Sequence, residues 1–124
     1  MRATLIIALA IVAGAGSASA KTATFAGDFN LVGTEPFWDA AIRPRWVTVK
    51  DAAETLSLRG RNRGPVVRRG VATWTVVSGA TRFRIVLRRA RCDDGMSERI
   101  YPYEAKILFD AGGKMEGCAA RPRR

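Results

Sequence analysis

The chain contains no histidine, and this absence excludes several kinds of catalytic site. A serine or cysteine nucleophile usually passes its proton to an imidazole, so neither a Ser-His-Asp triad nor a Cys-His pair can form. With only two cysteines, the chain also lacks the ligands of a typical tetrahedral zinc site. It has neither a phosphate-binding loop nor a dinucleotide-binding motif. We therefore expect a protein that is not an enzyme and that uses no cofactor or metal ion.

Long apolar runs are also absent, apart from one short segment near the N-terminus. Arg2 is followed by an apolar stretch over 5–12 and then by small residues that end in Ala-Ser-Ala at Ala20. This order is typical of a cleaved secretory signal, and the stretch is well short of the ~20 residues that span a bilayer. We expect cleavage after Ala20 and a single periplasmic or secreted domain over 21–124. An uncleaved membrane anchor is the alternative.

Only two cysteines are present, Cys92 and Cys118. In an exported protein such a pair usually forms a disulfide. Closing the loop between them would stabilise a domain of this size by roughly 3.5 kcal/mol on the chain-entropy estimate. The bridge would pin a polar, turn-rich loop to the far end of the fold. Two reduced, buried cysteines are the alternative.

No segment after residue 22 keeps a helical apolar stripe for three turns, whereas apolar and polar residues often alternate. Phe83, Ile85 and Leu87, for example, are separated by single residues, which is typical of half-buried antiparallel strands. We expect an all-β fold, a small antiparallel barrel or sandwich of about eight strands. The predicted strands are 24–32, 37–43, 46–50, 54–59, 66–69, 71–78, 81–91 and 104–109, with a short last strand at 114–119.

The strand that contains Leu87 has a conflict of side-chain alternation. If Leu87 faces the core, a regular strand also turns Arg89 inward and Cys92 outward. One extra residue, a β-bulge, removes the conflict because it reverses the alternation beyond it. We therefore predict a bulge between Leu87 and Cys92. It would turn Arg88 and Arg89 outward, and Ala90 would then face inward with Cys92.

Carboxylates are scarce: the chain has 11 of them against 21 lysines and arginines, of which 17 are arginines, and its net charge is +10. Guanidinium groups bind phosphate and carboxylate through paired hydrogen bonds, and a basic surface attracts anions. For an exported protein we expect an anionic partner such as lipopolysaccharide, an acidic glycan or an acidic protein, and no specific nucleic acid. A surface that serves solubility alone is the alternative. The candidate anion patch comprises Arg59, Arg61, Arg63, Arg68, Arg69, Arg82, Arg84 and Arg88.

Two further segments contain candidate binding residues. In the first, Gly33 to Trp38, the side chains of Phe37 and Trp38 should point to opposite faces, one into the core and one exposed or closing a barrel end. Glu35 should be exposed, or paired with an arginine if it is buried. The second is the loop from Cys92 to Arg99. The candidate binding residues of the two segments and of the strand that follows are Glu35, Phe37, Trp38, Asp94, Met96, Ser97, Tyr101 and Tyr103.

Three carboxylates, Asp93, Asp94 and Glu98, lie in the second segment. Their spacing does not match the twelve-residue calcium loop, and catalytic acids of glycosidases face each other across a cleft instead of sharing one tight loop. We expect the aspartates to cap turn amides, and Glu98 or Asp94 to pair with a nearby arginine. Tyr101 and Tyr103 should anchor the loop to the rim of the barrel, with a contact surface as the alternative.

These residues together resemble a family of small bacterial envelope proteins, many of them lipoproteins, that has no established activity. The family carries G-x-E-P-F-W near the N-terminus and C-x-D-G-M-S…Y-P-Y-x-A…G-C-A near the C-terminus. The matching residues are Gly33, Glu35 to Trp38, Cys92, Asp94 to Ser97, Tyr101 to Tyr103, Ala105 and Gly117 to Ala119. The resemblance implies an envelope location and a β fold. This chain departs from it in having no lipid-anchor cysteine, and it is more loosely similar to META/HslJ-type and lysozyme-inhibitor lipoproteins.

The residues and the resemblance favour a monomeric, non-enzymatic periplasmic protein that binds an envelope component or maintains the envelope. A protein-inhibitor module resembling lysozyme inhibitors is the first alternative, although two basic proteins repel each other. A small hydrolase or metal-binding protein that uses Asp93, Asp94 and Glu98 is the second.

Overall fold

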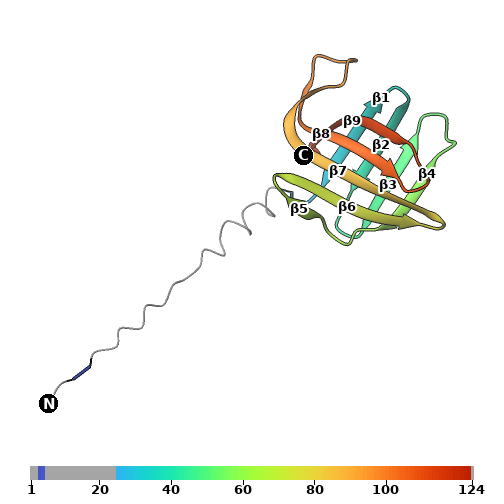
Figure 1. The fold of residues 1–124 in the computed structure, drawn as a ribbon. Coiled ribbons are helices and arrows are strands. Elements are labelled where there is room, and N and C mark those ends of the chain that lie inside the picture. The colour runs from blue at the N-terminus through green and yellow to red at the C-terminus, as the bar shows by residue number, and fades with distance from the viewer. Residues whose placement is uncertain (1–2, 5–24, 124) are drawn as a thin grey trace.

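A computed structural model describes residues 3–4 and 25–123, and residues 25–123 contain one curled antiparallel sheet of nine strands (Figure 1). The expected all-β fold is confirmed. The expected signal segment lies outside the described residues, except for residues 3–4, and so does its cleavage point at Ala20. The strands are β1 (Phe29–Thr34), β2 (Phe37–Ile42), β3 (Trp46–Asp51), β4 (Ser57–Arg61), β5 (Val66–Arg68), β6 (Val71–Ser78), β7 (Thr81–Asp93), β8 (Ile100–Phe109) and β9 (Lys114–Ala120).

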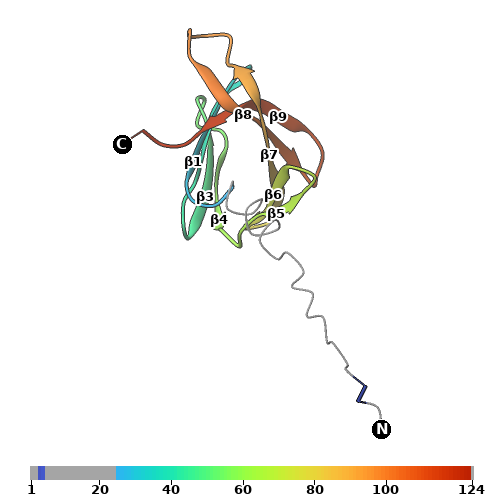
Figure 2. The ribbon, with the colours of Figure 1, turned by 90° about the vertical axis from the view of Figure 1, so that its left-hand side faces the viewer.

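The sheet consists of two meanders that meet at β1 and β9. The strand order is β4-β3-β2-β1-β9-β8-β7-β6-β5, so the first and last strands of the chain are neighbours in the middle of the sheet. Figure 2 shows β1, β3 and β4 in one wall of the half-barrel and β5, β6 and β7 in the opposite wall. The hairpin of β7 and β8 extends beyond both walls (Figures 1 and 2). Only three residue pairs join β1 to β9, as few as join the short edge strand β5 to β6, so the two meanders share a short ladder.

Inward-facing side chains fill the space between the two walls. Phe29 packs edge-on against Trp74 at 5.9 Å and against Tyr103 at 5.1 Å between ring centroids. Apolar residues at every second position of β3, β6 and β7 complete this core, as their alternation predicts. The burial of these side chains is the main stabilising contribution to the fold.

The half-barrel closes where β4 approaches β6 without forming a backbone ladder with it. The backbone amide of Arg59 donates instead to Ser78 Oγ, at 3.0 Å. A Cβ on Gly60 would lie 2.4 Å from Val76 Cγ1 and 2.5 Å from the carbonyl oxygen of Val77. A glycine is therefore needed for the two walls to approach this closely.

The predicted bulge in β7 is confirmed. The β7–β8 register shifts between Arg89, opposite Tyr103, and Cys92, opposite Tyr101, so that β7 carries one residue more than β8. Arg88 and Arg89 are both exposed, as expected. Pro102 of β8 lies opposite the bulge, where the ladder is interrupted and a missing amide hydrogen costs no strand pairing.

Several strand boundaries differ from those expected. β8 begins at Ile100 and not near 104, because the proline-containing segment continues the ladder past the bulge. β1 begins only at Phe29, after a turn. β4 begins at Ser57 because the turn before it is longer than expected: the Asp51 carboxylate accepts hydrogen bonds from Thr55 Oγ1 and, at 2.8 Å, from the amide of Leu56. These two hydrogen bonds also lower the pKa of Asp51, with the Thr55 bond as the larger cause.

The closure at β4 predicts the effect of one added methyl group. Gly60→Ala should lower the free energy of unfolding by about 2 kcal/mol, because the new Cβ meets backbone and side-chain atoms of β6. Ser57→Ala, at an exposed position of the same strand, should change it by no more than about 0.5 kcal/mol. Urea unfolding measures both values. An equal loss in the two variants would show that β4 does not close on β6 in this way.

Candidate functional site

The Gly33–Trp38 and Cys92–Arg99 segments, far apart in the sequence, line one groove of about 310 Å³. We call it the motif groove. Phe37 and Met96 are exposed on it, with 51% and 62% of their surface accessible, whereas Trp38 is buried. The expected division between Phe37 and Trp38 is thus observed. The lining residues are Val32, Gly33, Thr34, Phe37, Trp38, Asp39, Ala52, Asp94, Met96 and Tyr101.

The indole of Trp38 fills the gap that opens where β1 and β9 separate. The β1–β9 ladder ends at the pair Val32 and Cys118. Beyond that pair the carbonyl oxygen of Glu116 in β9 accepts a hydrogen bond from Trp38 Nε1, at 3.3 Å. A side-chain donor on β2 therefore takes the place of a main-chain donor on β1. The indole also satisfies its own N–H in a buried position.

Two glycines leave room for this indole. A Cβ on Gly33 would lie 1.8 Å from Trp38 Nε1. A Cβ on Gly117 would lie 2.0 Å from the carbonyl oxygen of Val32 and 2.9 Å from Trp38 Cζ2. Contacts this short do not occur, so both positions require glycine. Gly33 is thus required by the indole, and Gly117 is required first by the β1 backbone and then by the indole.

The disulfide between Cys92 and Cys118 is formed and joins β7 to β9 across β8. Its location corrects one expectation: Cys92 does not enter the main core but belongs to a separate small cluster with Cys118, Tyr101 and Ala120. The reason is that Cys118 and Ala120 alternate with Ala119, whose side chain faces the main core. The bridge therefore closes the opposite face of the sheet. It also indicates an oxidising environment.

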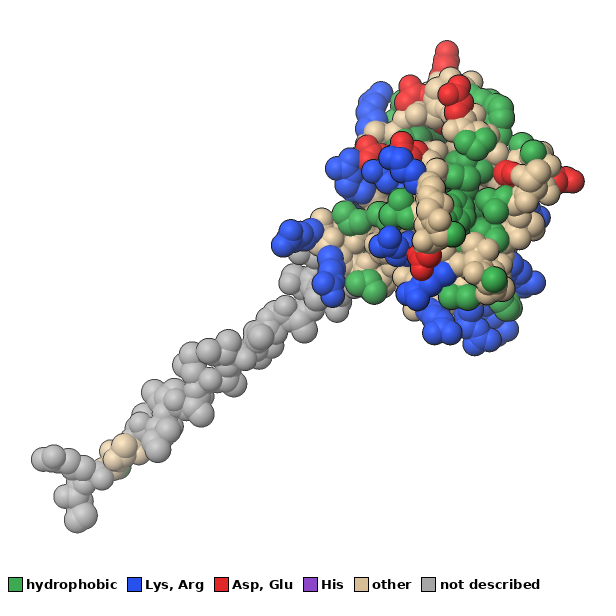
Figure 3. Space-filling model, turned by 45° about the vertical axis from the view of Figure 1, so that its right-hand side comes forward, with side chains coloured by type: hydrophobic (Ala, Val, Ile, Leu, Met, Phe, Trp, Pro, Cys, Tyr) green, Lys and Arg blue, Asp and Glu red, His purple; other side chains and the backbone are tan. Residues whose placement is uncertain are grey.

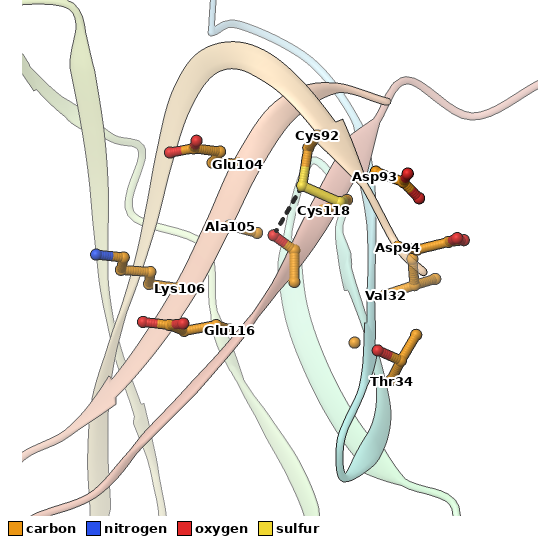
Figure 4. A pocket seen from close by; sticks show the side chains of 12 residues that line it. Val32, Thr34, Cys92, Asp93, Asp94, Glu104, Ala105, Lys106, Glu116 and Cys118 are labelled. Atoms are coloured by element: carbon orange, nitrogen blue, oxygen red, sulfur yellow. Dashed lines mark hydrogen bonds between the residues drawn. A yellow bond between two sulfur atoms is a disulfide. The ribbon is translucent and has the colours of Figure 1, made fainter. Parts of the chain in front are cut away.

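A second groove, of about 400 Å³, lies beside the disulfide, and we call it the outer groove (Figure 4). It shares Val32, Gly33, Thr34 and Asp94 with the motif groove, so the end of β1 borders both. Cys92 Sγ lies 3.4 Å from the carbonyl oxygen of Gly117. The charged residues of the outer groove are Asp93, Asp94, Glu104, Lys106 and Glu116.

The carboxylates of the loop bind backbone amides, as expected in part. Asp94 accepts hydrogen bonds from the amides of Met96, at 2.9 Å, and Ser97, at 3.0 Å, and Asp93 accepts one from Gly95, at 2.8 Å. The Met96 amide is the largest of the causes that lower the pKa of Asp94. The expected pairing with arginines is wrong: among the described residues, Asp93, Asp94 and Glu98 form no ion pair.

Both tyrosines anchor the loop, as expected. Tyr103 packs against Phe25 and Phe29 in the main core, and Tyr101 is buried beside the disulfide. Arg99 stacks over the Tyr101 ring at 4.4 Å. Burial raises the pKa of Tyr101, and the neighbouring Asp94 carboxylate raises it further. Glu35 is exposed and lies outside both grooves.

The eight arginines of the candidate anion patch are all exposed, but they lie on two different walls. Arg59 and Arg61 belong to β4, whereas Arg82, Arg84 and Arg88 belong to β7. Two of the eight are ion-paired, Arg82 with Asp110 at 3.4 Å and Arg88 with Glu104. For Arg59, Arg61, Arg63, Arg68, Arg69 and Arg84, no carboxylate of the described chain lies within ion-pair distance.

One exposed aromatic residue on this basic surface is absent from the predicted site. The Arg59 guanidinium lies 4.1 Å from the ring centroid of Trp46, which is 38% accessible. The alternation in β3 could have revealed it, because Val47 and Val49 face the core and Trp46 must then face outward. Figure 3 shows acidic side chains at the top of the molecule and also at other places on its surface, with lysines and arginines along the left and lower edges.

Comparison with known proteins gives no relative: no family model, no curated protein and no solved structure matches this chain. Within the described residues, no helix is long and apolar enough to cross a membrane. The same residues contain no group of three or more cysteines and carboxylates placed to hold a metal ion.

The glycine platform under Trp38 predicts a coupling between two positions. Gly33→Ala should cost about 2 kcal/mol of unfolding free energy, because the new Cβ would overlap the indole. In a Trp38→Leu background, where the smaller side chain leaves room, the same change should cost at most about 0.5 kcal/mol. Chemical unfolding of the two single variants and the double variant measures this coupling. Additive effects would mean that Gly33 is needed for a reason other than Trp38.

The contact between Asp94 and Tyr101 predicts a shift in a titration. Asp94→Asn removes the negative charge that opposes phenolate formation, so the pKa of Tyr101 should fall toward its ordinary value of about 10. Asp93→Asn, one residue away, should leave it unchanged. The phenolate absorbance of both variants in a Tyr103→Phe background reports on Tyr101 alone, because the chain has two tyrosines. An equal shift in both variants would show that the pKa of Tyr101 responds to any nearby negative charge and not to its contact with Asp94.

Proposed function

We propose that the protein is a non-enzymatic binding protein of the bacterial envelope that acts after export and contacts an anionic component there. The candidates are lipopolysaccharide, an acidic glycan and an acidic protein. The formed disulfide supports an exported location, since such bridges persist in oxidising compartments. The signal-like segment that ends at Ala20 supports it independently.

The observation that carries the proposal is the number of arginines without a carboxylate partner. Arg61 and Arg84, on opposite walls, are exposed and unpaired, and so are most of the other arginines of the candidate patch. A guanidinium that is not engaged within the protein keeps all its donors for an external phosphate or carboxylate. Lysines and arginines outnumber carboxylates by 21 to 11, so the protein as a whole is strongly basic.

A second candidate function, a protein-inhibitor module, is favoured by the motif groove. Phe37 and Met96 expose apolar surface there beside the carboxylates of Asp39 and Asp94. An apolar patch with an acidic border suits a basic protein target at short range. The overall charge of +10 opposes the approach of such a target. An inhibition assay against C-type lysozyme, with Phe37→Ser as the variant, distinguishes this function from the first.

The proposal predicts binding to anionic surfaces that depends strongly on salt. The mature protein should bind lipopolysaccharide, and its affinity should fall at least tenfold between about 50 and 300 mM salt, because the ions screen the guanidinium groups. Sedimentation with lipopolysaccharide, with neutral phosphatidylcholine vesicles as the control, measures this. Absent binding, or binding that salt does not weaken, would count against an anionic partner.

A further inference from the structure

We propose that a pocket at the start of β3 binds a sugar ring that carries a carboxylate or a phosphate. The inference rests on the proposed function and makes it more specific, because it assigns the anion to one site. The pocket measures about 410 Å³, within the usual range of small-molecule sites of ~300–1,000 Å³. We call it the arginine–tryptophan pocket. It is lined by Pro44, Arg45, Trp46, Arg61 and Asn62.

The walls of this pocket are fixed by hydrogen bonds within the protein. The amide of Asn62 donates to the carbonyl oxygen of Arg45, and its side-chain amide donates to the carbonyl oxygen of Arg43, both at 2.8 Å. The amide of Arg43 donates to the carbonyl oxygen of Trp46 at 2.9 Å. The β2–β3 turn and the end of β4 thus form one rigid unit. A ligand that binds there orders little additional backbone, which favours affinity.

The two arginines of the pocket are available to a ligand. Neither Arg45 nor Arg61 has a carboxylate partner among the described residues, and no carboxylate lines the pocket. The nearby Arg43 differs from them: its guanidinium donates to the carbonyl oxygen of Phe29 at 3.0 Å and pairs with Asp28. Arg43 therefore supports the fold, and two neighbouring guanidiniums face a site that contains no negative charge of its own. This arrangement selects an anion.

Trp46 gives the pocket an apolar surface beside these charges. It is 38% accessible, whereas Trp38 and Trp74 are buried at 3% and 2%. Its direct partner across the β3–β4 ladder is Arg61, and Arg59 stacks on its ring at 4.1 Å. The stacked guanidinium holds the indole in place, since cation–π contacts favour this geometry. The C–H face of a sugar ring with an anionic substituent can contact the exposed part of the indole while Arg45 and Arg61 bind the substituent. An acidic or phosphorylated sugar has this combination, and an inorganic anion does not.

Tryptophan fluorescence tests the inference, because Trp46 is the one exposed indole among the three tryptophans. The probes are glucosamine 1-phosphate and galacturonic acid, which separate a phosphorylated headgroup sugar from an acidic glycan. Neutral N-acetylglucosamine and inorganic phosphate are the controls that lack the charge or the ring. We expect at least one charged sugar to change the fluorescence at concentrations at which both controls do not. Arg61→Gln should weaken this binding roughly tenfold, the effect of losing one charge-assisted hydrogen bond.

The matched control is Arg84→Gln, which removes the same charge from the exposed face of β7 and should weaken binding less than twofold. Equal losses in the two variants would contradict specific binding at the arginine–tryptophan pocket. They would still agree with the proposed function, as diffuse electrostatic binding of an anionic partner. Inorganic phosphate that binds as well as the sugars would likewise overturn a sugar site. If neither the sugars nor lipopolysaccharide bind, the inference and the proposed function both fail. Thermal unfolding confirms that both variants are folded, as expected for exposed side chains.

Discussion

The half-barrel depends on Trp38, which lies at the junction of the two meanders. A hydrogen bond and close packing hold its indole there. β1 and β9 share only three residue pairs, and beyond them the indole bridges the strands by donating to Glu116. Gly33 and Gly117 provide the space for it, and the disulfide closes the other face of the same junction. Both motif segments of the sequence therefore contribute to one structural task, the joining of the first strand to the last.

The buried and the exposed residues of the two motifs have different roles. Buried members such as Trp38 and Cys118 maintain the junction, whereas Phe37 and Met96 remain exposed on the motif groove. The arginine–tryptophan pocket lies elsewhere, at the β2–β3 turn, and shares no residue with either groove. A protein with a rigid junction and a separate basic pocket can bind an anionic component without any catalytic group.

Much of the fold could be predicted because it is encoded locally. Alternation in β6 and β7 determines which side chains are buried, and the conflict around Leu87 was sufficient to predict the bulge. The junction could not be predicted, since the pairing of β1 with β9 brings together Val32 and Cys118, which no local pattern connects. The same holds for the arginine–tryptophan pocket, which depends on hydrogen bonds between Asn62 and the β2–β3 turn.

The most direct test of this account is a map of ligand-induced amide shifts by nuclear magnetic resonance, with the delipidated carbohydrate of lipopolysaccharide as the ligand. The account predicts that the largest shifts occur at Arg45, Trp46 and Arg61, together with the indole N–H of Trp46. The indole N–H of Trp38 should stay unchanged, because it is buried and bonded within the protein. Shifts concentrated at Phe37 and Met96, with none around Trp46, would contradict the account.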